Sequence, residues 1–494
     1  MTAHSLNRAS LPHLRPPVLA PGFDVAGVTP GIVHLGLGGF HRAHLARYTH
    51  RLMEQDEGAL RFGIIGAGLR EADKPLLDSL AAQDGLYTLV ERSGTDEVVA
   101  VIGSLAGLAY GGAGSGPVLD AIAQPGIRIV SLTVTENGYC LNPATKQLDP
   151  DHPLIRQDLA TPGQPASAIG VIVESLRRRR DAGQPAFTAM TCDNIQNNGD
   201  VLREAVLALA RLRGGDLAGW IAEHGAFPNS MVDRITPVPA AADSEYLLQA
   251  YGLHDRAPVV CEDFTQWVVE DHFPQGRPAW EAVGAQFVPD VAPYEAMKLR
   301  LLNGSHLAVA GLGRLMGLAY IHETMADPAL HAYMAALMDR EAGPTLPDVP
   351  GIDLPEYKRT LLRRFGNPAI LDTVERVNRD APLNVLLDPI RARLAMGGGV
   401  ELLSLALAAW MRRMAGVDED GAPIPIRHPL ASLLQERAAA GGPDPGPLLA
   451  IEPLFGALGA DERLRGPLGR WLAALYAQGA RATLNQALRE LNIA

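Results

Sequence analysis

Cysteine is scarce in this sequence of 494 residues. Its three cysteines, Cys140, Cys192 and Cys261, are too few and too scattered for a disulfide framework, and no pair has the spacing of a metal site. Residues 1–23 lack an apolar segment of the signal-peptide type, and no uninterrupted apolar run of about 18 residues occurs elsewhere. These absences argue against a secreted, disulfide-rich protein and against a membrane protein. We therefore expect a reduced, soluble, cytoplasmic protein.

Positive charge is also in deficit. The chain has 43 Lys and Arg against 55 Asp and Glu, which gives a formal net charge of −12. This balance argues against nucleic acid or an anionic membrane surface as the main partner. The one basic run, Arg177–Arg180, is followed at once by DAG. We interpret it as the solvated end of a helix.

Short β-branched runs alternate with helical patterns over the first 290 residues. The runs of strand type are GIVHLGLGGF (31–40), FGIIGAG (62–68), LYTLVERS (86–93), GIRIVSLTVTENG (126–138) and AFTAMTCDN (186–194). Strands that alternate with helices indicate a mostly parallel, doubly wound sheet. Residues 1–30 are Pro-rich and aperiodic, and we interpret them as a strap lying over the fold.

The pattern changes after about residue 290, where helical periodicity continues with almost no strand signal. The predicted fold class is therefore α/β with two domains. Residues 1–290, strap included, are expected to form a Rossmann-type domain with a doubly wound sheet. Residues 291–494 are expected to form a mainly α-helical domain.

The stretch GLGGFHRAH places Gly36, Gly38 and Gly39 between a strand and a helix. Glycine there permits a tight turn and a close approach of a pyrophosphate, whose charge a helix N-terminus stabilises. The third glycine of the usual dinucleotide motif is missing, because His41 stands in its place. The alternative is a purely structural turn, but the strand–turn–helix context favours dinucleotide binding.

His41 and His44 are spaced like metal ligands, but no third ligand is evident nearby, so we expect no metal. His41 and Arg42 are instead expected to make polar contacts at the cofactor phosphates or at the domain seam. An acid after the second strand should hold the adenosine ribose, and the candidates are Glu71 and Asp73. A carboxylate at this point repels a 2′-phosphate and favours NAD over NADP. The alternative for Asp73 is a helix-capping acid.

A polar set occupies the otherwise apolar stretch PYEAMKLRLLNGSHLAVAGLG, residues 293–313. On an α-helical wheel Glu295, Lys298, Asn303 and His306 share one arc, while leucines surround the helix on all sides, which indicates burial. Burial lowers the pKa of a lysine, and such a lysine can act as a general base near neutrality. The alternative is a structural Lys–Glu pair with two satisfied polar neighbours.

Seven stretches together resemble the polyol-specific long-chain dehydrogenase/reductase family. They are GLGGFHRAH, SLTVTENGYC, TCDNIQNNGD, FPNSMVDRITP, VVCEDFTQWVVED, GRPAWEAVGAQFVPDVAPYEAMKLRLLNGSH and YIHETMADP. The VDRITP and KLRLLNGSH elements are specific to that family, and the likeness runs from about residue 30 to beyond residue 480. The resemblance implies a zinc-independent, NAD-dependent oxidation of D-mannitol to D-fructose and the reverse reaction. The implied domains are an NAD-binding one and a helical substrate-binding one.

The resemblance also assigns roles to single residues. Lys298 is implied to be the general base, while Asn194 and Asn303 hold the substrate oxygen as it becomes alkoxide-like. His306 is implied to orient substrate hydroxyls, and Asp233 and Glu295 to tune the lysine and pass its proton to water. The candidate cofactor-binding residues are Gly36, Gly38, Gly39, Phe40, His41, Arg42, Asp73 and Glu136.

Two departures from the family pattern concern specificity. In DTVERVNRDAPLN, Arg376 matches a substrate-binding arginine, but Asn384 replaces the lysine that normally follows it. The loss of this cation weakens the case for a uronate substrate. It leaves arabinitol and sorbitol open beside mannitol. Ala72 stands where relatives often have a second acid, so we expect NAD preference with less strict exclusion of NADP.

Other functions stay open at this point. They are a D-arabinitol 4-dehydrogenase, a sorbitol dehydrogenase, a fructuronate reductase and a non-catalytic nucleotide-binding sensor. The expected partner is a small polyol or ketose. A monomer agrees with the large two-domain core, although the sequence does not determine the oligomeric state.

Overall fold

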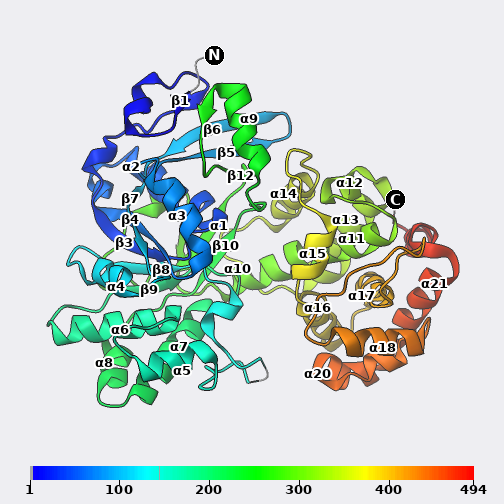
Figure 1. The fold of residues 1–494 in the computed structure, drawn as a ribbon. Helices are drawn as coiled ribbons and strands as arrows, with labels where there is room; N and C mark the ends of the chain where they lie inside the picture. Colours follow the sequence, from blue (N-terminus) through cyan, green and yellow to red (C-terminus); the bar gives the residue numbers. More distant parts are fainter. Residues whose placement is uncertain (1–3, 144, 494) are drawn as a thin grey trace. The chain divides into compact units, whose positions relative to one another are not determined.

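The computed structural model describes residues 4–143 and 145–493 and divides the chain into two compact units (Figure 1). The first unit comprises residues 1–292 and the second residues 293–494. The sequence predicts a boundary after residue 290, and the structure divides the chain after residue 292.

The first unit contains a five-stranded sheet in which every neighbouring pair is parallel. In spatial order its strands are β7 (Leu105–Tyr110), β4 (Gly63–Gly68), β3 (Pro30–Leu35), β8 (Ile129–Leu132) and β9 (Thr188–Thr191). The first of these strands in the sequence, β3, therefore lies in the middle, and the chain winds outward from it in both directions. This is the doubly wound order of Rossmann-type domains, and it confirms the predicted fold class.

Strand β3 is buried on both faces, which explains why it reads as a continuous apolar run. Val33 and Leu35 pack into one layer of side chains with helices α4 (Gly116–Ala123) and α6 (Ala168–Asp181), whereas Ile32 packs into the opposite layer. Burial of such side chains stabilises the sheet by about 1.5–3 kcal/mol each. The remaining helices of this unit are α1 (Gly39–Ala43), α2 (Leu45–Met53), α3 (Lys74–Ala81), α5 (Pro153–Ala160), α7 (Asn198–Arg213), α8 (Leu217–His224) and α9 (Ala241–Tyr251).

Strand β5 (Tyr87–Ser93) does not belong to the parallel sheet, contrary to the simplest interpretation of the sequence. It pairs antiparallel with β6 (Asp96–Ile102), in register Ser93↔Asp96, so a loop of two residues joins the strands. Gly94 in that loop has φ +59°, a conformation that such tight hairpin turns require. The hairpin forms part of a second sheet, in the order β12 (Val259–Glu262), β5, β6 and β2 (Val18–Leu19).

The Pro-rich N-terminal segment is paired into the fold by two short strands. Strand β1 (His4–Ser5) pairs with β11 (Leu253–His254), and β2 pairs with β6. A third sheet contains β10 (Ser230–Asp233), β13 (Gln266–Glu270) and β14 (Gln286–Val288). The strap is therefore a structural part of the first unit.

The second unit is mainly helical over its described residues, as predicted. Its helices are α10 (Ala292–Met297), α11 (Gly304–Leu315), α12 (Ile321–Ala326), α13 (Pro328–Ala336), α14 (Leu354–Phe365), α15 (Val374–Asp380), α16 (Asn384–Ala395), α17 (Glu401–Arg413), α18 (Ala431–Gly441), α19 (Gly446–Leu449), α20 (Glu452–Phe455) and α21 (Glu462–Glu490). Helices α11 and α17 are buried over almost their whole length, and they pack against each other to form the core of this unit.

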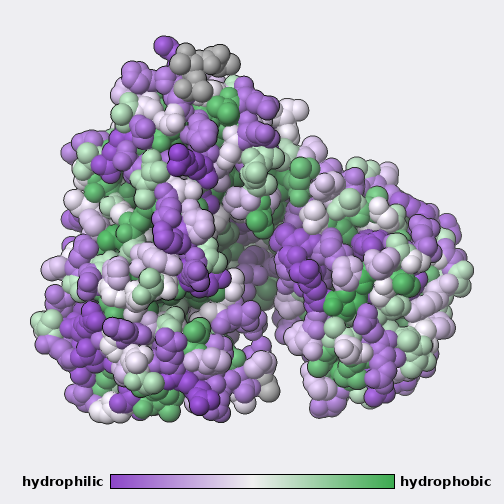
Figure 2. All heavy atoms as spheres, viewed as in Figure 1, coloured by the Kyte–Doolittle hydropathy of each residue, from purple (hydrophilic) through white to green (hydrophobic). Residues whose placement is uncertain are grey.

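The visible surface is a mosaic of hydrophilic and hydrophobic residues (Figure 2). Large apolar side chains that are exposed, such as Leu19, Val238 and Met396, are scattered along the chain and need no special explanation. None of the helices in the described part of the chain has the length and apolar character needed to cross a bilayer.

Candidate active site

The glycine turn directly follows β3, where the strand order reverses. Gly36 has φ +91°, and a Cβ atom built there would lie 2.2 Å from the Thr133 carbonyl oxygen in the chain leaving β8. No side chain therefore fits at this position. Gly38 is exposed and begins the next helix, so its backbone is open to a ligand. Ligands of doubly wound sheets bind at this edge, and the turn has the form that a pyrophosphate requires.

Two histidines support the turn from inside the protein. His34 Nε2 lies 2.9 Å from Thr133 Oγ1, which donates a hydrogen bond of 2.9 Å to the Gly36 carbonyl. Burial lowers the pKa of His34 to about 3 and that of His41 well below its ordinary value. The two rings stack with centroids 3.4 Å apart, as only neutral imidazoles do without repulsion. The two neutral rings therefore support the turn structurally and add no charge to it.

His41 and Arg42, which the sequence assigns to polar contacts at the cofactor phosphates or at the domain seam, both have buried side chains, His41 with 1% of its surface exposed. The Arg42 guanidinium donates to the Ala257 carbonyl and lies over the ring of Tyr87, whose hydroxyl donates back to the Arg42 carbonyl. These contacts anchor the turn to the second sheet. Phe40 is half-buried and stacks on His44.

The helix that follows the glycine turn is interrupted at His44, whose backbone angles are φ −117° and ψ −93°. Helix α1 therefore has only five residues, and α2 begins as a separate helix at Leu45. So short a helix adds little dipole at the glycine turn, because the macrodipole is summed over aligned peptide units. The open backbone of the turn remains as the feature that fits a phosphate.

Asp73 lies just after β4 and has the capping role that the sequence left open as the alternative, while its role at the adenosine ribose stays a prediction. Its Oδ2 accepts hydrogen bonds of 3.0 Å from the amides of Leu69 and Arg70, and its Oδ1 pairs with the Arg70 guanidinium at 2.8 Å. The carboxylate thus caps the turn that leaves β4 while remaining half-buried at the carboxyl edge of the sheet. Glu71 is exposed.

Glu136 follows β8 and is exposed, in a surface ion pair with Lys146 at 3.0 Å. The preceding residue, Thr135, has φ +62° and ψ 167°, a combination almost confined to glycine. Asp193 imposes this conformation, since its carboxylate accepts from the amides of Val134 and Thr135 at 3.0 and 2.9 Å. The loop after β8 is thereby fixed to the loop after β9.

Sequence reasoning missed Asp193, although it directly precedes the chosen Asn194. The Asp193 carboxylate is buried, which raises its pKa, and Tyr139 also donates to it at 2.9 Å. Asn194 itself is exposed at the carboxyl end of β9. Its position could have indicated a role, because Asp193 is a polar residue just after a strand that is predicted to end at the ligand-binding edge.

Asp233 ends β10 and is buried. Asn198 links β10, the strand of Asp233, to the loop after β9. The Asn198 side chain donates to the carbonyls of Asp193 and Ser230 at 3.0 and 2.8 Å. The adjacent Arg234 donates to the carbonyls of Ala43 and Glu262. The motif VDRITP therefore ties the third sheet to the glycine-turn region.

In the second unit the polar set lies on a continuous helix that changes its hydrogen-bonding pattern. Lys298–Asn303 form a π-helical segment, preceded by α10 and followed by α11. The α-helical wheel used for these residues is therefore wrong across this segment, because a π-helix bonds i to i+5 instead of i to i+4. Such insertions occur frequently at functional sites.

The predicted burial of this set is confirmed for Glu295, Lys298 and His306, with only 8% of Lys298 exposed. Asn303 is half-buried. The His306 ring stacks on Phe365 with centroids 4.3 Å apart. A lysine, a carboxylate, an amide and an imidazole thus follow one another along a buried helix.

Arg376 and His306 converge on a carboxylate that sequence reasoning missed. Asp372 accepts two hydrogen bonds of 2.5 Å from Arg376, and its Oδ2 lies 3.5 Å from His306 Nε2. The sequence did offer one indication of this pair, because Asp372 and Arg376 have the i, i+4 spacing at which opposite charges interact. Asn384 is exposed at the start of α16.

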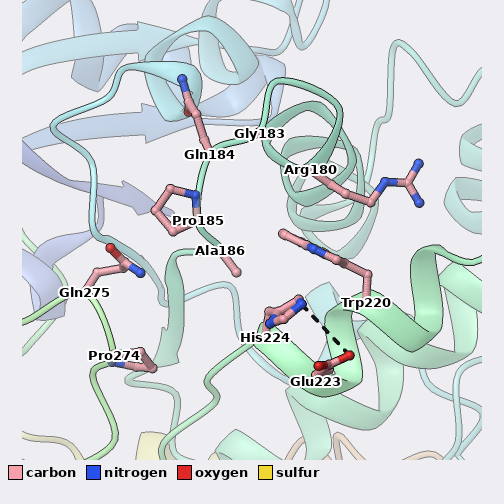
Figure 3. A pocket seen from close by; sticks show the side chains of 10 residues that line it. All are labelled: Arg180, Gly183, Gln184, Pro185, Ala186, Trp220, Glu223, His224, Pro274 and Gln275. Atoms are coloured by element: carbon pink, nitrogen blue, oxygen red, sulfur yellow. Dashed lines mark ion pairs between the residues drawn. The ribbon is translucent and has the colours of Figure 1, made fainter.

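A pocket of about 550 Å³ lies elsewhere in the first unit (Figure 3). Arg180, Trp220 and His224 project around it from α6 and α8, and Gln184–Ala186 line it just before β9 begins. It therefore lies at the amino end of β9, whereas doubly wound sheets bind their ligands at the carboxyl ends. We do not assign the reaction to it. No group of three or more His, Cys, Asp or Glu that could hold a metal ion occurs among residues 4–143 and 145–493.

Family models match both parts of the chain. The mannitol dehydrogenase Rossmann domain matches residues 30–282, and the mannitol dehydrogenase C-terminal domain matches residues 290–470. The mannitol 2-dehydrogenase of Cereibacter sphaeroides is 41% identical over 95% of this chain and 99% of its own length. The mannitol 2-dehydrogenase of Aspergillus fumigatus is 44% identical over 87% of each chain.

Two solved structures share the whole architecture. The ternary complex of Pseudomonas fluorescens mannitol 2-dehydrogenase with NAD and D-mannitol has a TM-score of 0.89 and 44% identity, and the match covers 99% of this chain and 100% of that one. A D-sorbitol dehydrogenase in substrate-free form has a TM-score of 0.88 and 34% identity, with coverage of 97% and 100%.

Proposed function

This chain belongs to the mannitol dehydrogenase family, and on that premise we propose that it is an NAD-dependent polyol dehydrogenase that interconverts D-mannitol and D-fructose. The observation that carries the proposal is the buried Lys298 on a π-helical turn, with Asn303 ending the same turn and His306 following it. A module that only bound nucleotides would have no use for a buried amine beside two further polar groups.

The glycine turn fits NAD as the cofactor. Gly36, Gly38 and Gly39 would hold the pyrophosphate, because no side chain fits at Gly36 and the backbone at Gly38 is exposed. Asp73 would hold the adenosine ribose, and the exposed Glu136 lies at the carboxyl end of the neighbouring β8. Bound NAD supplies the acceptor for the hydride that leaves the carbinol carbon.

A secondary alcohol is a weak acid, so its oxidation needs a base and a stabilised oxygen. Lys298 in its neutral form accepts the hydroxyl proton, and burial favours that form because it penalises the charged amine. Asn194 and Asn303 donate hydrogen bonds to the oxygen as negative charge develops on it. Donors of this kind are worth about 3 kcal/mol each when they are removed.

The remaining residues of the set handle the proton and the substrate. Asp233 and Glu295 are buried carboxylates that tune the lysine and relay its proton to water. His306 and Arg376 bind substrate hydroxyls. No step in this scheme calls for zinc.

Replacement of Lys298 by Ala tests the proposal. We expect turnover to fall by at least about a thousandfold, while NADH binding, measured by fluorescence titration, stays within about twofold. Lys358→Ala is the matched control, since this half-buried lysine of α14 pairs with Asp339 at 2.7 Å. A collapse of NADH affinity in Lys298→Ala would instead make the lysine structural or cofactor-binding.

A sorbitol dehydrogenase is the second candidate, favoured by the structural match to such an enzyme and by Asn384 in place of a cation. A substrate panel decides between the two. Initial rates with D-mannitol, D-sorbitol, D-arabinitol, D-fructose and D-fructuronate, each with NAD(H) and NADP(H), should rank mannitol and fructose first. Higher kcat/KM for sorbitol would reverse the assignment.

We further propose that the protein works in the cytoplasm as a monomer. All three cysteines are free and buried, as suits a reducing compartment. Light scattering after gel filtration would give a mass of one chain, and a stable dimer peak would contradict this.

A further inference from the structure

Asp372 connects the two substrate-binding candidates of the second unit. Its carboxylate holds Arg376 through Nε and Nη2 at 2.5 Å each and lies 3.5 Å from His306 Nε2. Only 5% of the Asp372 side chain is exposed, against 39% of the Arg376 side chain. The acid is thus buried, whereas the arginine that it pairs with is partly exposed.

The backbone around Asp372 fixes this arrangement. The next residue, Thr373, caps α15 by accepting a hydrogen bond of 3.1 Å from the Arg376 amide. Farther along α15, the Asn378 side chain donates to the Ala310 carbonyl of α11 at 2.8 Å. Helix α15 is therefore fastened to the helix that continues from Lys298 and carries His306.

The pairing determines which donors Arg376 has left. A guanidinium is a planar group with five N–H donors, and Asp372 occupies the edge formed by Nε and Nη2. One N–H of Nη1 and one of Nη2 remain on the end edge as a second fork of two parallel donors, which can donate to a hydroxyl or to a carboxylate alike. The shape of the free edge therefore does not select the substrate, and selection depends on charge.

The charge of the pair does distinguish the two kinds of substrate. Arg376 alone would attract an anion, but Asp372 cancels its charge and would itself repel a substrate carboxylate. We propose that Asp372 is a specificity-determining positioning residue that makes this cluster select uncharged polyols and ketoses over sugar acids. This inference rests on the proposed function, because it takes Arg376 and His306 as substrate-binding.

The test compares two substrates of ketose reduction with NADH. D-Fructose is uncharged, and D-fructuronate carries a carboxylate in place of the terminal hydroxymethyl group. In Asp372→Asn we expect the ratio of kcat/KM for fructuronate to that for fructose to rise about tenfold, since the charge of Arg376 is no longer cancelled. The KM for fructose should rise while NADH affinity stays unchanged.

Asp388→Asn is the matched control. Asp388 forms an exposed pair with Arg391 on α16 at 2.9 Å, so the same chemical change removes the same charge without touching Arg376. The control should keep the wild-type ratio. An equal rise in Asp388→Asn would mean that net charge alone is responsible and would overturn the proposal.

The double variant Asp372→Asn/Arg376→Gln separates charge balance from structural damage. Removal of both partners restores neutrality, so the ratio should return toward the wild-type value, which a mere packing defect would not do. If Asp372→Asn fails to fold, Arg376→Gln alone supplies the test, because it leaves the acid uncompensated and should lower the ratio further.

An unchanged ratio in folded Asp372→Asn, or a higher ratio in Arg376→Gln, would refute the inference. Its failure is distinguishable from failure of the proposed function, which Lys298→Ala tests. Lost turnover in Lys298→Ala together with an unchanged ratio in Asp372→Asn would reject only the role of Asp372.

Discussion

At the scale of single residues, Asp73 illustrates how one carboxylate can serve both the fold and the cofactor. It caps the turn after β4 through two amides and pairs with the exposed Arg70. Asp73→Ala should raise the ratio of kcat/KM for NADP to that for NAD about tenfold or more. The change removes the charge that repels a 2′-phosphate and releases a guanidinium that can bind one.

The measurement is mannitol oxidation with each cofactor at fixed pH and ionic strength. Asp78→Ala is a suitable control, since Asp78 is an exposed acid on α3 that pairs with Lys74. The loss of the cap should also lower stability by about 0.5–2 kcal/mol, as measured by denaturant unfolding. An unaltered cofactor ratio would transfer the ribose role to Glu71.

The residues that sequence reasoning found and missed differ in a physical way. Lys298 and Glu295 were visible because charge inside an apolar helix is conspicuous in a sequence. Asp193 and Asp372 were missed because loops are rich in acids. Only the folded chain shows that these two accept hydrogen bonds from residues they hold in place.

At the scale of secondary-structure elements, a buried acid connects two helices of the second unit. Glu341 lies in the π-helical segment Leu337–Ala342 and accepts hydrogen bonds from the amides of Leu402 and Leu403 at 2.9 and 2.8 Å. It therefore caps α17, the central helix of that unit. Burial raises the pKa of Glu341 to about 7.

This shift predicts a dependence of stability on pH. A group with a raised pKa binds its proton more tightly in the folded state, so its contribution is complete below about pH 4.5 and is lost as pH rises through 7. The loss is on the order of 3 kcal/mol for a shift of this size. Glu341→Gln cannot ionise, and its free energy of unfolding should change much less between pH 5.5 and 8.

Urea denaturation at several pH values measures this effect. The variant should be less stable than the wild type at pH 5.5, because a glutamine oxygen replaces only one of two acceptors, and the difference should shrink at pH 8. Glu356→Gln, on the exposed surface of α14, should retain the wild-type slope. A full wild-type slope in Glu341→Gln would place the titrating group elsewhere.

Sequence periodicity predicted most elements correctly but failed at two of them for identifiable reasons. The apolar run of β5 resembles a parallel strand, and only the two-residue turn at Gly94 reveals a hairpin. The π-helical turn from Lys298 to Asn303 is invisible to a wheel that assumes α-helical spacing. Both failures arise where local backbone geometry departs from the regular form that periodicity presupposes.

At the scale of the whole molecule, the predicted organisation followed from features that persist over hundreds of residues. Strands alternating with helices indicated the doubly wound sheet, and their disappearance after about residue 290 indicated the helical unit. The details of strand order could not be foreseen, because they depend on which strands bury their faces against each other over long sequence separations.

The molecule as a whole should work without a metal ion. Dialysis against EDTA, with residual metal measured by mass spectrometry, should leave mannitol oxidation unchanged, because Lys298 takes the hydroxyl proton as a general base and no metal is needed to acidify the alcohol. A zinc-dependent alcohol dehydrogenase treated in parallel should lose activity. Inactivation by EDTA that added zinc reverses would contradict the lysine mechanism.

The widened turn between α10 and α11 holds one residue more than an ordinary α-helical turn. Removing one residue from 298–303 would let the segment relax into α form while the flanking helices keep nearly their present rotation about the helix axis, because a shorter α segment turns through a similar total angle. Such a deletion should leave the protein folded but move the Lys298 and Asn303 side chains out of the directions that the π turn gives them, so activity would be lost without loss of the fold.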